Sequence, residues 1–114
     1  MMSRLGCWML GASLLVAASA ASAIDPSIKC VSDKLKLAAK YTACRLAAVA
    51  DAAREFTTPS FDKCENSYLR GWDKAESRAR AKGAPCWTEG DAEEVKGDID
   101  AHTGSLAESL AGGK

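Results

Sequence analysis

Residues 25–56 read DPSIKCVSDKLKLAAKYTACRLAAVADAAREF, and this stretch predicts the first and longest helix of the fold. Asp25 is suited to cap a helix and Pro26 to occupy its first position. Apolar residues recur every three or four positions, the period of a helix, with a gap at Thr42: Ile28, Val31, Leu35, Ala38, Leu46, Val49, Ala53 and Phe56. We therefore expect a helix over residues 26–55 with this stripe as its apolar face.

Two further helices are expected downstream. The chain turns at residues 57–60, where Thr58 can cap and Pro59 can begin a second helix over residues 59–82. This helix carries one stripe that is mostly apolar: Phe61, Cys64, Tyr68, Trp72, Ala75 and Ala79. Thr88 and Asp91 resemble a capping box, which predicts a third helix over residues 89–111. Its apolar edge consists of Ala92, Val95, Ile99, Leu106 and Leu110.

The cysteines predict how the first two helices pair. Cys30 and Cys44 stand about 21 Å apart along a straight helix, whereas disulfide partners need Cα atoms within about 7 Å. In an antiparallel hairpin, Cys30–Cys86 and Cys44–Cys64 both place the apex between residues 54 and 58, but the crossed pairing requires two incompatible apices. We therefore expect the nested pairs. Because Cys44 lies farther from the turn than Cys64, either the first helix frays early or the 54–60 connection doubles back.

The first 23 residues match the three-part pattern of a secretory signal peptide. Arg4 is the only charged residue before Asp25, and Ala21-Ser22-Ala23 forms a small-x-small cleavage site. An uncleaved anchor is the alternative, because residues 5–24 carry no charge, but most of them are not strongly apolar. We expect residues 1–23 to be a signal peptide. Residues 24–114 then form an exported four-cysteine domain, periplasmic or extracellular, with no stable membrane span after cleavage.

Composition limits the classes of partner and of chemistry. The chain has 114 residues, enough for one domain, and its 15 basic and 15 acidic side chains balance, which gives no reason to expect nucleic acid as a partner. Structural zinc sites draw on cysteine pairs about two to four residues apart, whereas gaps of 13, 19 and 21 residues separate these cysteines. We expect oxidised cysteines, with no metal site and no cofactor.

The remaining candidate residues favour structural roles. His102 is the only histidine and, lying on the Ile99–Leu106 stripe, is expected at the edge of a helix interface. Aromatic residues at helical spacing are expected in the core, with Trp87 the most exposed of them. Arg78, Arg80 and Lys82 complement the dipole at the end of the second helix. Asp73 and Glu76 are expected to dilute that cluster as an anion site.

The pattern of Cys30 to Leu46, then Cys64 with Trp72-Asp73-Lys74-Ala75-Glu76, then Cys86 with Gly90-Asp91, resembles short exported proteins of Gram-negative bacteria that carry no assigned activity. The resemblance implies an exported bacterial location and a four-cysteine helical unit. It brings no catalytic residue, cofactor or partner.

These observations favour an all-α domain, a disulfide-stapled antiparallel helical hairpin plus a third C-terminal helix. The expected function is a non-enzymatic binding or structural module, because a rigid hairpin presents a helix face to a protein partner at little ordering cost. The alternative is a small secreted enzyme or toxin, a hydrolase using His102 with Asp98 or Asp100.

Overall fold

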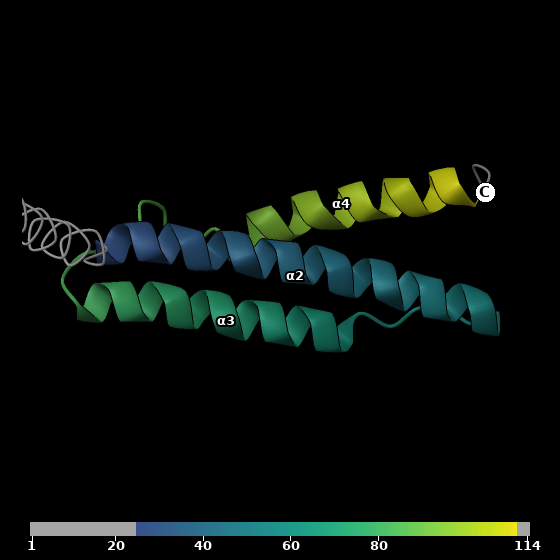
Figure 1. Ribbon diagram of the computed structural model, residues 1–114, viewed down its shortest axis with the longest axis horizontal. Coiled ribbons are helices and arrows are strands. Elements are labelled where there is room, and N and C mark those ends of the chain that lie inside the picture. Colours follow the sequence, from purple (N-terminus) through teal and green to yellow (C-terminus); the bar gives the residue numbers. More distant parts are fainter. Residues whose placement is uncertain (1–24, 112–114) are drawn as a thin grey trace, which may run out of the picture.

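The computed structural model describes residues 25–111, and the expected signal peptide at residues 1–23 lies outside them. The described residues form three helices and no strand: α2 (Pro26–Glu55), α3 (Asp62–Ala81) and α4 (Ala92–Leu110). Helix α3 runs antiparallel to α2, and α4 runs in the same direction as α2 (Figure 1). The predicted all-α hairpin with a third helix is confirmed. None of these three helices is both long and apolar enough to cross a membrane.

Both predicted disulfides are present. The outer disulfide joins Cys30 to Cys86 with their Cα atoms 5.5 Å apart, and the inner disulfide joins Cys44 to Cys64 with their Cα atoms 5.8 Å apart. The outer disulfide is buried, whereas Cys44 of the inner disulfide is exposed. On chain-entropy estimates each bridge contributes about 3–4 kcal/mol to stability, less for whichever closes second.

The connection between α2 and α3 doubles back, as one of the two expected alternatives required. Past Cys44, α2 continues for about 16 Å to Glu55, and Phe56 follows it in a left-handed conformation with φ of 55°. The following residues run back beside the last turns of α2 before α3 begins (Figure 1). The predicted start at Pro59 is wrong, because the chain must stay extended until it reaches Asp62 in order to bring Cys64 level with Cys44.

The predicted apolar face of α2 is wrong for several of its members. Leu35 is 66% exposed and Phe56 is 96% exposed. The buried residues of α2 are instead Cys30, Lys34, Tyr41 and Ala52. Because both disulfides tie α2 to the α3 side, they set the rotation of α2 about its own axis and leave Leu35 facing solvent.

The core consists of aromatic residues where all three helices meet. Tyr41 packs on Tyr68 with ring centroids 4.8 Å apart, and Tyr68 packs on Trp72 at 5.1 Å. From α4, Val95 and Ile99 cover this stack. The stripe predicted for the second helix is confirmed from Cys64 to Ala79, all of whose members are buried.

At the start of α4, tertiary contacts replace the predicted capping box. The Thr88 hydroxyl donates to the Asp91 carboxylate at 2.7 Å, and no side chain caps the helix. Gly90 has φ of 71°, a left-handed conformation that favours glycine. The helix therefore begins at Ala92 and not at residue 89.

Candidate functional site

A buried cluster of charges, the Lys34 cluster, joins α2, α3 and the loop before α4. The Lys34 ammonium lies 2.7 Å from a Glu76 oxygen and 2.9 Å from an Asp91 oxygen, and donates to the Thr88 carbonyl at 2.7 Å. The Trp72 indole N–H also donates to Asp91. Burial raises the pKa of Asp91, but hydrogen bonds from Thr88, Lys34 and Trp72 outweigh it and hold this pKa well below its usual range. Its side chains satisfy one another, so the Lys34 cluster is structural.

A second set of polar side chains, the Asp100 cluster, fixes α4 on the hairpin. Asp100 accepts hydrogen bonds from Tyr41 and Lys96, and its carboxylate lies 3.2 Å from Arg45. Lys96 also reaches Glu65 of α3 at 2.7 Å. Burial raises the pKa of Asp100, but the hydrogen bonds and the charge of Arg45 lower it below its usual value. Asp100, one of the two carboxylates considered for the hydrolase alternative, is therefore engaged in contacts that hold α4 on the hairpin.

His102 lies in a different environment from the one expected. It is exposed on α4, where an interface edge was expected, while its neighbour Thr103 is buried and accepts a hydrogen bond from Arg45. Among residues 25–111, no hydrogen bond or ion pair joins His102 to Asp98 or to any other side chain. Asp98 lies one helical turn before His102 on α4, and Asp100 is engaged by Tyr41, Arg45 and Lys96.

The cysteines and Trp87 lie where the sequence placed them. The four cysteines within residues 25–111 form two disulfides. This part of the chain contains no group of three or more His, Cys, Asp or Glu residues placed to hold a metal. Trp87 is exposed directly after the outer disulfide, whereas Tyr41, Tyr68 and Trp72 are buried.

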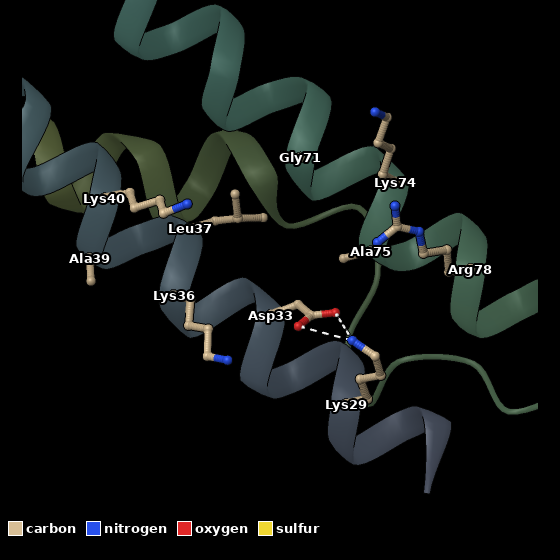
Figure 2. A pocket seen from close by; sticks show the side chains of 10 residues that line it. All are labelled: Lys29, Asp33, Lys36, Leu37, Ala39, Lys40, Gly71, Lys74, Ala75 and Arg78. Carbon is tan, nitrogen blue, oxygen red and sulfur yellow. Dashed lines mark hydrogen bonds and ion pairs between the residues drawn. The ribbon is translucent and has the colours of Figure 1, made fainter. Parts of the chain in front are cut away.

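The most distinctive open surface is a groove of about 460 Å³ along the seam of α2 and α3. We call it the basic groove. Its walls carry five cations and one carboxylate over a mostly apolar floor: Lys29, Asp33, Lys36, Leu37, Ala39 and Lys40 from α2, and Gly71, Lys74, Ala75 and Arg78 from α3 (Figure 2).

The cations of the basic groove are mostly uncompensated. Asp33, its only carboxylate, pairs with Lys29 at 3.1 Å across one helical turn. Within residues 25–111, no ion pair involves Lys36, Lys40, Lys74 or Arg78. The groove therefore presents a net positive charge on a chain whose charges balance overall.

The floor of the basic groove depends on a close approach of the two helices. Leu37 extends from α2 toward α3 at Gly71 (Figure 2). A Cβ atom at Gly71 would lie 2.5 Å from a Leu37 methyl carbon, so any other residue would displace this side chain. Smaller cavities extend the groove, one toward the inner disulfide and one toward Lys82.

The basic groove was not predicted from the sequence, and of the basic cluster expected at the end of the second helix only Arg78 lines it. Glu76 was expected to dilute the basic cluster at the end of the second helix, but it turns away and is buried against Lys34. Arg80 pairs with Glu89 outside the basic groove. The lysines at steps of seven and four in the first helix, residues 29, 36 and 40, were the available signal, because they share one side of that helix.

No known protein family matches this chain, and neither a curated protein nor a solved structure is significantly similar to it. The candidate site therefore rests on the geometry and charge of the basic groove alone.

Proposed function

We propose that this chain is an exported, non-enzymatic binding module that holds an acidic segment of a partner protein in the basic groove. The observation that carries the proposal is the placement of four cations without ion-pair partners, two from each helix, on the walls of one groove. Its floor of Leu37, Gly71 and Ala75 adds apolar contact for a docked segment.

The two disulfides, the buried Lys34 cluster and the partly buried Asp100 cluster hold the groove's helices in place before binding. A preorganised surface loses little conformational entropy when a partner docks. An acidic protein segment is favoured over a nucleic acid because the whole chain carries balanced charge, which gives a polyanion no long-range attraction.

Export is supported by the signal-peptide pattern of residues 1–23 and by the oxidised state of the four cysteines. The test is N-terminal sequencing of the protein recovered from the periplasm or medium of a Gram-negative host. The mature chain should begin at Ile24, and a chain still beginning at residue 1 in a membrane fraction would contradict export by cleavage.

The binding test uses a fluorescent Ala-rich helical peptide with Glu at every fourth position, and a sister peptide with Gln in place of Glu. Lys36→Gln with Lys74→Gln should weaken binding of the Glu peptide about 2- to 30-fold, from two exposed charge contacts. Arg54→Gln with Arg80→Gln is the matched control, because it removes the same charge outside the basic groove. Equal losses in both variants, or equal binding of the two peptides, would refute the proposal.

A further inference from the structure

One face of α4 has the charge that the basic groove lacks. Residues Glu94, Asp98, Ala101, Ser105 and Glu108 are all exposed and follow one another at steps of four and three, so they share one side of the helix. We call this side the acidic face. Among residues 25–111, no ion pair involves any of its three carboxylates.

The spacing of charges on the acidic face matches that of the basic groove. Glu94 and Asp98 are one helical turn apart, about 6 Å, as are Lys36 and Lys40 on one wall of the groove. Lys74 and Arg78 repeat this spacing on the other wall. A helix whose carboxylates stand one turn apart can therefore face two pairs of cations at once.

The acidic face also has the shape that a shallow groove between two helices requires. Its central residues, Ala101 and Ser105, are small and let a helix backbone approach the groove's floor at Leu37 and Gly71. Large side chains at these positions would hold the helix away from that floor.

The chain's own α4 is anchored away from the basic groove. Tyr41 and Arg45 of α2 hold α4 through Asp100 and Thr103, and no residue of α4 lines the basic groove. The acidic face and the basic groove of one molecule therefore remain available to other molecules.

We propose that the acidic segment bound by the basic groove is α4 of a second copy of this chain, an inference that rests on the proposed function. The acidic face of one copy docks in the groove of the next, which is a head-to-tail contact. Such a contact uses two different surfaces, so it leaves an unused groove at one end and an unused α4 at the other and can add further copies. Balanced net charge means that copies do not repel one another at long range.

Sedimentation velocity on the purified, oxidised protein tests this contact. Wild-type protein should sediment faster as its concentration rises from about 10 µM to about 1 mM, and added salt should reverse the effect. The groove variant, Lys36→Gln with Lys74→Gln, and the face variant, Glu94→Gln with Asp98→Asn, should each self-associate about tenfold more weakly. All four positions are exposed, so circular dichroism should show unchanged helix content.

Mixing the two variants gives the decisive outcome. The intact acidic face of the groove variant can dock in the intact groove of the face variant. The surfaces left over in this complex are the substituted groove and the substituted acidic face, which bind further copies more weakly. The mixture should therefore form a 1:1 dimer that does not grow with concentration. Wild-type protein that stays monomeric throughout, or a mixture that does not associate, would overturn the inference.

The same variants separate this inference from the proposed function. If wild-type protein binds the Glu peptide through the basic groove yet remains monomeric, the second-copy inference fails and the binding function stands. If it neither binds the peptide nor associates, both fail.

Discussion

Replacing Lys34 with Met should cost more stability than any other single lysine substitution in the hairpin. The ammonium is buried, with 6% of the residue exposed, and contacts Glu76, Asp91 and the Thr88 carbonyl at 2.7–2.9 Å. Met preserves most of the volume but leaves Glu76 as a buried carboxylate whose remaining donor is the Gly90 N–H at 3.0 Å. Removing one partner of a buried ion pair costs about 3–5 kcal/mol. For a domain of this size, the melting temperature should fall by at least about 12 °C.

The assay is urea unfolding of the oxidised protein, followed by circular dichroism at neutral pH. Lys36→Met is the matched control, because Lys36 is exposed on the same helix and should cost less than about 0.5 kcal/mol. Adding Glu76→Met to Lys34→Met should restore at least about 1 kcal/mol by removing the stranded carboxylate. A loss below about 1 kcal/mol for Lys34→Met, close to that of the control, would show that solvent screens this cluster and would refute the reasoning.

Three further predictions follow from exposure, charge and backbone geometry. Limiting thiol reductant should open the inner disulfide first, because Cys44 is exposed whereas both cysteines of the outer disulfide are buried. Alkylation with mass spectrometry should label the cysteines of the inner disulfide first, and the reverse order would contradict the burial of the outer disulfide. Folding lowers the pKa of Asp91 below its ordinary value of about 4. The stabilisation that Asp91 provides is therefore present above that ordinary pKa and is lost as the pH falls through the pKa of the folded state. Asp91→Asn should therefore lower the urea midpoint at pH 7, and the midpoint of this variant should fall less on acidification than that of the wild type. An equal fall in both proteins would show that Asp91 does not contribute to the loss of stability in acid. Gly97→Ala should stabilise α4 by up to about 1 kcal/mol, since a Cβ there meets nothing within 4 Å. Gly71→Ala should gain less or lose stability because it displaces Leu37, and thermal melts showing equal gains would contradict the close approach of α2 and α3.

The disulfide pairing and the helical hairpin could be predicted from the sequence because both follow from spacing. Two cysteines on one helix cannot reach each other, and only one pairing with the other two is compatible with a single turn. The buried stripe of α3 was predictable for the same reason, since that helix carries one stripe that is mostly apolar.

The helix starts that were missed show tertiary contacts overriding local signals. Thr58 and Pro59 form a good start for a helix, but the chain has to remain extended there to reach the inner disulfide. Thr88 was expected to cap the third helix, but its hydroxyl binds the Asp91 side chain and its carbonyl accepts from Lys34. Asp91 lies nearby in the sequence, but Lys34 is 54 residues away and cannot be identified as a partner from the local sequence.

The candidate site was missed because it depends on which way single side chains turn. The buried face of α2 with Cys30, Lys34 and Tyr41 was not predicted, because the expected apolar face followed Ile28, Val31 and Leu35 and a lysine was not expected to be buried. Once Lys34 and Glu76 pair inside the hairpin, the remaining cations of both helices face one groove without that carboxylate.

The most direct test of the binding account is an amide chemical-shift titration by nuclear magnetic resonance, with the Glu peptide added to the ¹⁵N-labelled face variant, which keeps its groove and self-associates weakly. We expect the largest chemical-shift changes on the lining of the basic groove, and we expect no such changes with the Gln peptide. The residues concerned are Lys36, Leu37, Lys40, Gly71 and Lys74. Shifts that gather instead on the exposed apolar side of α2, at Ile28 and Leu35, or no shifts at all, would contradict it.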